Sequence, residues 1–214
     1  MGKKHSIRTA WVILICCVAT VAKAQFTYTT SGGTIIISGY TGSGLSVTIP
    51  STINGLPVVG IGNNAFSGKS TITNVYIPSS VVSIGNYAFQ SCSDLKNIAI
   101  PDSVTNIGQY AFSYCSGLTS VTIPGGVTSI QNWAFGECNA VTNVTIPSSV
   151  TNIGNYAFSG LYRLKSIAIP SSVTRIGDWA FQSCMGLQSI SIPTSVTSLG
   201  SFSFHYCSGL NIDA

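Results

Sequence analysis

The chain has 214 residues, of which 45% are hydrophobic and only 7% are charged, and its formal net charge is +4. Four of its nine basic residues precede residue 25, so the rest of the chain carries five basic and five acidic side chains. Proteins gain most of their affinity for phosphate backbones from clustered Lys and Arg, and this balance therefore argues against a nucleic-acid partner.

The first 24 residues have the pattern of a secretory signal peptide. Basic residues precede an uncharged, mostly apolar run at 9–22, and Ala22-Lys23-Ala24 supplies the small-x-small cleavage pattern. The alternative is an uncleaved membrane anchor, but the run is shorter than the roughly 20 apolar residues that a spanning helix needs. We expect cleavage after Ala24, a secreted or cell-surface protein, and no membrane contact except through the leader.

Residues 25–48 are predicted to cover the N-terminal end of the fold. A β-branched run at 34–37 lies between Gly32-Gly33 and a glycine-rich turn near Gly42 and Gly44, a pattern that favours a β-hairpin. The end coil of a solenoid needs a cover with a polar outer face, and we assign this role to the hairpin.

Residues 49–214 follow a strict 23-residue repeat. An Ile-Pro pair recurs at this step from Ile77-Pro78 to Ile192-Pro193, and an Ala-Phe pair recurs from Ala65-Phe66 onward. The unit is L-x-x-V-x-I-P-x-x-V-x-x-I-G-x-Y-A-F-x-x-C-x-x. This period lies in the leucine-rich-repeat range and outside those of ankyrin, tetratricopeptide and propeller repeats.

The columns of the repeat predict how each coil folds. The V-x-I segment alternates like a strand with one buried face, and the proline after it ends the strand. The next Val and Ile begin a return path, the Gly supplies a turn, and Ala-Phe lies on a short helical or 3₁₀ turn with Phe pointing inward. Because a single unit cannot bury these residues, stacking must do so. We predict an α/β-type, mostly β solenoid, a right-handed coil with one parallel sheet.

The two ends of the array are irregular. The first unit has an insertion of five residues within 51–57, and the last unit is incomplete. Leu210 keeps the phase of the repeat, whereas Asp213 falls in an interior column unless Ile212 shifts in by one residue. This pattern predicts a frayed or truncated end, or an end that a partner protects.

The unit, with L-x-x-V-x-I-P followed by I-G-x-Y-A-F-x-x-C, resembles the BspA-type leucine-rich repeats of bacterial surface proteins. The resemblance covers about residues 49–214, and 25–48 resembles the segment often found ahead of such arrays. It implies an exported protein, in some cases adhesive to host matrix proteins or other cells. It implies no shared catalytic residues, and the cell-wall anchors of some relatives are missing here.

Five cysteines share one column of the repeat, and neighbouring coils would bring them within disulfide range. They cannot all pair, and Leu161 fills the same column, so we predict buried, unpaired thiols that act as small apolar side chains. Disulfides stay the alternative, because an exported protein can form them. The column contains Cys92, Cys115, Cys138, Cys184 and Cys207.

The chain shows no set of residues for catalysis. After the leader its only histidine is His205, expected to be a solvated terminal residue, and its acidic residues occupy different columns. There is no CxxC or HxxxH metal spacing, no phosphate loop and no nucleophile elbow. We therefore predict no enzymatic activity, no metal and no cofactor.

Two columns are candidates for ligand binding. The outward face of the predicted strands carries small, uncharged polar groups, which form either a solvated face or a docking surface. Its candidate residues are Asn74, Tyr76, Asn97, Thr122, Asn143 and Thr145. The other column is aromatic, either a packing ladder or a stacking strip for glycans or protein. It contains Tyr87, Tyr110, Trp133, Tyr156 and Trp179.

These features favour a secreted or surface binding module that recognises an extracellular protein or glycan. One alternative is a structural block that associates end to end through its C-terminal coil. Another is an ice- or crystal-binding sheet, suggested by the Thr, Ser and Asn rows, although Ala and Tyr interrupt them. Asn143-Val144-Thr145 matches a glycosylation sequon on a predicted strand, which matters only if the organism that makes the protein glycosylates such sites.

Overall fold

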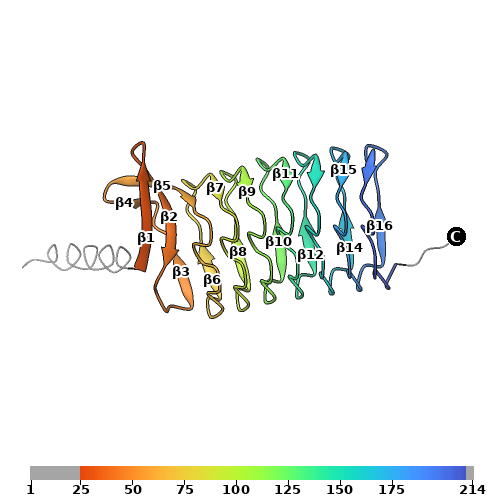
Figure 1. Cartoon of the computed structure of the whole chain (residues 1–214), viewed down its shortest axis with the longest axis horizontal. Helices are drawn as coiled ribbons and strands as arrows, with labels where there is room; N and C mark the ends of the chain where they lie inside the picture. The colour runs from red at the N-terminus through yellow and green to blue at the C-terminus, as the bar shows by residue number, and fades with distance from the viewer. Residues whose placement is uncertain (1–24, 211–214) are drawn as a thin grey trace, which may run out of the picture.

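The computed structural model describes residues 25–210, which form a solenoid of stacked coils (Figure 1). The predicted signal peptide, Cys16, Cys17 and the predicted C-terminal irregularity at 212–213 lie outside the described residues. The predicted leucine-rich-repeat solenoid is confirmed, because residues 23 apart pair in parallel register, as in Ser120↔Asn143. Within the described residues no helix is long and apolar enough to cross a membrane.

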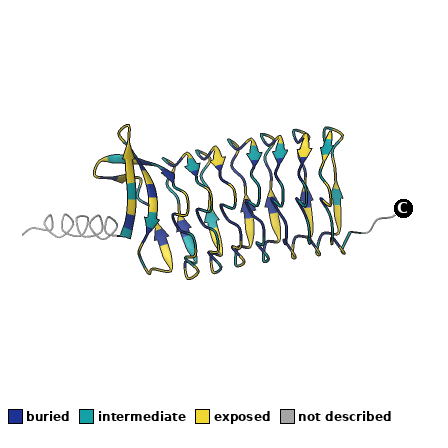
Figure 2. Cartoon of the chain, viewed as in Figure 1, coloured by how far each residue is buried: buried dark blue, intermediate teal, exposed yellow. Residues whose placement is uncertain are grey.

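One strand of each coil belongs to a row that we call the front row, which runs along the lower part of Figure 1. The middle residue of each front strand points into the coil and the flanking residues point outward, so buried and exposed positions alternate (Figure 2). A proline is the second residue after the end of each of these strands and cannot extend them, because it lacks an N–H. The front strands are β3 (Ser46–Thr48), β6 (Asn74–Tyr76), β8 (Asn97–Ala99), β10 (Ser120–Thr122), β12 (Asn143–Thr145), β14 (Ser166–Ala168) and β16 (Ser189–Ser191).

The return path of each coil also forms a strand, and these strands make a second parallel row, the back row. The sequence predicted one parallel sheet, so the second row is a difference from that prediction. Except in the last coil, the Ile of each short back strand is buried, as at Ile84 and Ile107. The back strands are β5 (Leu56–Ile61), β7 (Ser83–Ile84), β9 (Asn106–Ile107), β11 (Ser129–Ile130), β13 (Asn152–Ile153), β15 (Arg175–Ile176) and β17 (Ser198–Leu199).

The Ala-Phe pairs lie in consecutive turns, and not in the helical or 3₁₀ turn that the sequence suggested. The aromatic residue before each pair has a positive φ, for example 58° at Tyr87, and a left-handed residue interrupts a right-handed helix. The N–H of Tyr87 donates to the Gln109 carbonyl of the next coil at 2.9 Å, and the N–H of Phe89 donates to that of Ala111 at 2.8 Å. The turns therefore form a third line of hydrogen bonds between coils.

The N-terminal hairpin predicted in residues 25–48 is formed by β1 (Phe26–Ser31) and β2 (Thr34–Tyr40), which pair antiparallel. Gly32 and Gly33 close it with positive φ angles of 56° and 75°. The hairpin extends the back row, because β2 pairs in parallel with β5. Strand β3, also within 25–48, pairs with β6 and so belongs to the front row.

The insertion at 51–57 is a second, smaller hairpin. Strand β4 (Thr52–Ile53) pairs antiparallel with the start of β5. Its turn residues Asn54 and Gly55 have φ angles of 54° and 78°, the left-handed pair that Asn-Gly favours in two-residue hairpin turns. The irregular spacing of the first unit therefore comes from one added turn, and the coil register resumes in β5.

A single continuous core runs along the solenoid. Its centre is a stack of phenylalanines, each at most 1% exposed, with ring centroids 4.9 to 5.9 Å apart. Leu, Val and Ile columns surround this stack, so each coil covers the apolar edge of its neighbour, as predicted. The stack consists of Phe66, Phe89, Phe112, Phe135, Phe158 and Phe181.

The coils are joined unequally. We call the contact between the coil with β8 and β9 and the coil with β10 and β11 the middle junction. Within residues 25–210 it is the one junction at which neither the front strands nor the back strands pair. Its turns remain joined, since the N–H of Phe112 donates to the Ala134 carbonyl at 2.9 Å and the two Phe rings stack at 5.3 Å.

Substitutions in the repeat explain this opening. At closed junctions a Cβ in the Gly column would lie too close to the preceding coil, for example 2.6 Å from the backbone nitrogen of Asn86 at Gly108. At the middle junction Gln131 occupies this column, so its Cβ keeps the two coils apart. Gln109 and Gly126 also replace the usual Asn and Ser, whose side chains tie other coils together, as Asn86 and Ser149 do.

Candidate functional site

The front row presents the predicted ligand-binding residues on one side of the solenoid. Asn97, Thr122, Asn143 and Thr145 are exposed, Asn74 is half-buried, and Tyr76 is 61% exposed. Parallel pairing aligns them by column, as in Asn74↔Asn97. The structure therefore gathers these side chains into one uncharged polar surface.

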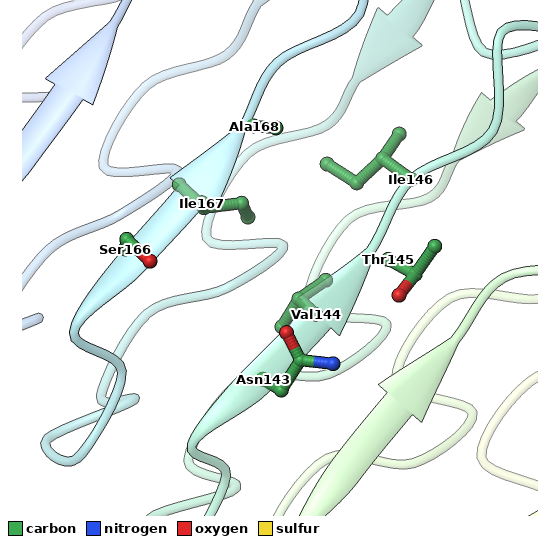
Figure 3. A pocket seen from close by; sticks show the side chains of 7 residues that line it. All are labelled: Asn143, Val144, Thr145, Ile146, Ser166, Ile167 and Ala168. Atoms are coloured by element: carbon green, nitrogen blue, oxygen red, sulfur yellow. The ribbon is translucent and has the colours of Figure 1, made fainter.

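A hollow of about 300 Å³ interrupts this surface between β12 and β14 (Figure 3). Asn143 and Thr145 line it from β12, and Ser166 and Ala168 line it from β14. Its apolar part comes from Val144, Ile146 and Ile167, which are 6 to 9% exposed. The hollow thus combines an amide, two hydroxyls and an apolar patch, and no charged side chain lines it.

The aromatic column lies on the turns after the back row and forms a continuous stack. Tyr87 and Tyr110 are 4.9 Å apart with rings 12° from parallel, and Trp133 and Tyr156 are 4.5 Å apart. Burial raises the pKa of Tyr110, and the neighbouring tyrosines contribute to this. Because the ring faces inside the stack cover one another, only ring edges are available to a ligand along the column.

All five cysteines in the described residues are buried and unpaired. Each thiol donates a hydrogen bond to a Phe carbonyl of the preceding coil, as Cys138 Sγ does to Phe112 O at 3.1 Å. Burial raises the pKa of Cys138 to about 12 and the pKa of Cys115 also lies well above its usual range. The predicted structural role of this column is therefore confirmed, and a reactive thiolate is disfavoured.

One carboxylate lies on the turns beside the cysteine column. Glu137 packs so closely over Gly160 that a Cβ there would lie 2.5 Å from the carboxylate. The Tyr162 hydroxyl donates to Glu137 Oε2 at 3.5 Å. Burial raises the pKa of Glu137 in spite of this hydrogen bond, and the Glu137 charge in turn raises the pKa of Tyr162. The cluster ties two neighbouring coils together.

His205 differs from the solvated residue that the sequence suggested. Its ring packs edge-on against Trp179 at 5.3 Å and Phe202 at 5.4 Å, and lies 3.8 Å from the Tyr206 ring. No acid or nucleophile accompanies it in these contacts. Among the described residues, no group of three His, Cys, Asp or Glu side chains is placed to hold a metal ion.

An asparagine ladder is a further column that the sequence analysis did not assign. Asn63, Asn86, Asn132 and Asn155 each accept, through Oδ1, a hydrogen bond from the backbone N–H of the next coil, at 2.8 to 3.0 Å. Asp178 does the same at 2.8 Å. The signal was the recurrence of Asn before the aromatic residue every 23 positions. This column stabilises the stack through its Oδ1 atoms.

The chain matches the family model of the BspA type Leucine rich repeat region over residues 40–160 and 133–212. Among solved structures, a leucine-rich repeat protein from T. pallidum is 34% identical, with a TM-score of 0.84 over 88% of this chain and 89% of that chain. A leucine-rich repeat protein from Bacteroides ovatus is 36% identical, with a TM-score of 0.65 over 84% of this chain and 55% of that chain.

A leucine-rich cell surface protein from Faecalibacterium prausnitzii is 27% identical, with a TM-score of 0.54 over 87% of this chain and 74% of that chain. No curated protein matches the chain. The repeat columns, the solenoid and these similarities agree on the same type of repeat over nearly all of the described residues. The chain therefore belongs to the family of BspA-type leucine-rich-repeat proteins.

Proposed function

We propose that this protein is an exported, non-enzymatic binding module that recognises an extracellular protein or glycan through its front row. The observation that carries the proposal is the front face itself, an aligned, uncharged and largely exposed polar surface with a hollow between β12 and β14. Solenoids commonly bind partners on such extended surfaces. The similarity to a cell surface protein and the signal-like pattern at 1–24 support export.

The remaining chemistry supports binding more than catalysis. The thiols are buried, and the one histidine in the described residues packs against aromatic rings. General acid–base or nucleophilic catalysis requires a positioned base near the reacting group. The front face offers amides and hydroxyls only, which can hold a ligand through hydrogen bonds.

The proposal is tested with the secreted chain on arrays of matrix proteins and glycans. Asn97→Arg and Thr122→Arg place a large charge on the front face, and we expect each to reduce binding at least tenfold. Asn106→Arg is the matched control, because Asn106 is equally exposed but lies on the back row. Equal binding by the front-face and back-row variants would refute the proposed face.

A second candidate function is end-to-end association through the last described coil. This coil exposes apolar side chains that other coils hide or stack, with Leu199 53% and Phe202 58% exposed. Tyr206, on the same coil, is 63% exposed. A row of exposed apolar groups at the end of a solenoid favours packing against another surface.

Sedimentation velocity distinguishes the two functions. Self-association predicts that the sedimentation coefficient rises with protein concentration and that Leu199→Lys with Phe202→Ser removes the rise. A sedimentation coefficient that is independent of concentration would exclude association and leave the front-face proposal unaffected.

A further inference from the structure

The hollow between β12 and β14 has an origin that can be traced in the backbone. At this junction the front strands do not pair, whereas the back strands β13 and β15 pair normally. The Gly177 N–H also donates to the Ile153 carbonyl at 2.8 Å on the back side. The opening is therefore confined to the front face, and the back row behind it is paired.

A lysine in a threonine column accompanies the opening. At neighbouring junctions the residue before the front strand donates its backbone N–H to the preceding coil, as Thr142 does to the Thr119 carbonyl at 2.9 Å. The Thr142 hydroxyl reinforces this contact at 3.3 Å. Lys165 occupies the equivalent position, has no hydroxyl, and makes neither bond to Thr142 in the described structure. The Lys165 N–H and the Thr142 carbonyl are therefore unpaired in the described structure, whereas Lys96 and Gln188, which also lack a hydroxyl, donate their N–H groups to the preceding coil.

Thr142 and Lys165 are exposed, so water can reach their unpaired backbone groups. A ligand that covers these groups must supply hydrogen bonds in place of water, because burying them without a partner is costly. The Lys165 N–H is a donor and the Thr142 carbonyl is an acceptor, and the Asn143 and Ser166 side chains supply both kinds of group. A ligand that satisfies this edge must donate and accept at short range. Hydroxyl groups do so in any orientation.

We propose that this front-face hollow is the anchoring subsite for one unit of a neutral glycan. The inference deepens the proposed front-face function and rests on it. Sugar hydroxyls would pair with the amide, hydroxyl and backbone groups of the rim, and the apolar C–H face of the ring would cover Val144 and Ile167. None of the seven residues that line the hollow is charged, which matches a neutral ring, and the charged Lys165 lies just outside this lining.

The geometry favours a glycan over an extended peptide. A peptide that adds to a sheet needs a row of free backbone groups along an edge. Here the flanking front strands are closed, since β10 pairs with β12 and β14 pairs with β16. The free groups around the hollow therefore belong to one junction between two strands of three residues each, which suits one compact polyhydroxylated unit of a longer polymer.

The test closes or fills the hollow and measures binding of the full chain to arrayed neutral oligosaccharides of glucose, mannose, galactose and N-acetylglucosamine. Lys165→Thr replaces the lysine with the residue found at positions 119 and 142 and removes the charge next to Ser166. Its control is Lys96→Thr, the same change of charge in the same column at a junction that is already paired. Ala168→Trp fills the hollow, and Ala99→Trp is its control in the equivalent exposed position of β8.

We expect the unchanged chain to bind at least one of these oligosaccharides and Ala168→Trp to weaken that binding at least tenfold. Lys165→Thr should weaken binding to the same extent if it closes the front strands. The two controls should bind within about twofold of the unchanged chain. Hydrogen exchange of the backbone amide at residue 165 shows whether the lysine variant closes the strands, and Ala168→Trp decides the matter if it does not.

Two results would overturn the inference. One is an unchanged chain that binds none of the neutral oligosaccharides, including the case in which it binds only peptides or charged glycans. The other is undiminished binding by Ala168→Trp. In either case the broader proposal stands if Asn97→Arg still abolishes binding of whatever ligand the arrays identify, so the two failures are distinguishable.

Discussion

Repairing the middle junction should stabilise the solenoid measurably. The variant combines Gln131→Gly, Gln109→Asn and Gly126→Ser, which gives this junction the residues found at its closed neighbours. Closed junctions have three ties that are missing here, of which Gly154 N–H to Ile130 O at 2.8 Å is one. The others are Asn132 Oδ1 accepting from the Asn155 N–H at 2.8 Å and Ser149 Oγ donating to Val127 O at 2.7 Å.

Each restored hydrogen bond contributes about 1 kcal/mol net to stability. The glycine added at 131 and the glycine removed at 126 change the backbone entropy by similar amounts in opposite directions. We therefore expect the free energy of unfolding to rise by about 3 kcal/mol. For a chain of this length that corresponds to an increase in Tm of roughly 6 to 12 °C.

Hydrogen exchange of backbone amides shows whether the triple variant stabilises the middle junction itself. In the unchanged protein the amides of Thr128, Gln131 and Asn132 make no hydrogen bond within the described structure. They should exchange much faster than Thr151, which donates to Thr128 O at 2.9 Å. The triple variant should protect all three positions. Slow exchange at these amides in the unchanged protein, or a variant no more stable than it, would refute the explanation.

Three further predictions concern the turns. Gly160→Ala should lower the free energy of unfolding by about 1–2 kcal/mol, because residue 160 has a positive φ that alanine rarely adopts. The loss should be greater still, because the added Cβ meets the Glu137 carboxylate. Gly55→Ala is the control: residue 55 also has a positive φ but open space around it, so thermal melts of this variant isolate the φ contribution. Glu137 should make the protein less stable as pH rises above 4.5, the ordinary pKa of a glutamate side chain, since burial raises its folded-state pKa and the folded state holds the proton more tightly. Glu137→Gln should remove this decline in denaturation curves measured from pH 4 to 8 by roughly one-unit steps, and an unchanged slope would contradict the assignment. The buried thiols of Cys115 and Cys138 should resist alkylation at neutral pH until the chain is unfolded, because their pKa values are raised; rapid native-state labelling, or disulfides found by mass spectrometry, would contradict this.

The buried columns could be predicted from the sequence because they recur without gaps. Phe89, Phe112 and Phe135 must share one environment if coils stack in register, and all three are buried. The back row was missed because strands such as Ser83–Ile84 have two residues each. Two residues are too few to show the alternation that identifies a strand, and they form one only by pairing with the neighbouring coil.

The conformation of the aromatic column could not be inferred from residue types. Bulky residues rarely adopt a left-handed backbone, yet Tyr87, Tyr110 and Trp133 all have φ near 58°. The N–H of each donates to the next coil, as Trp133 does to Asn155 O at 2.9 Å. The hydrogen bond and the ring stacking together offset the cost of the conformation, and both depend on a neighbour that a single unit does not contain.

The two open junctions make individual positions of a repetitive chain distinct. If every coil were identical, the front face would present the same groups at each step, and no position would differ from the next. At the middle junction, where Gln131 replaces glycine, both rows of strands are unpaired, although the Thr119 N–H still donates to the Lys96 carbonyl at 3.3 Å. At the junction between β12 and β14 only the front row is unpaired, and the back row behind it is closed. A ligand loses affinity when it must first order its site, and an opening with a paired back row reduces this cost. We therefore expect ligand specificity to depend on the junction between β12 and β14 more than on the middle junction.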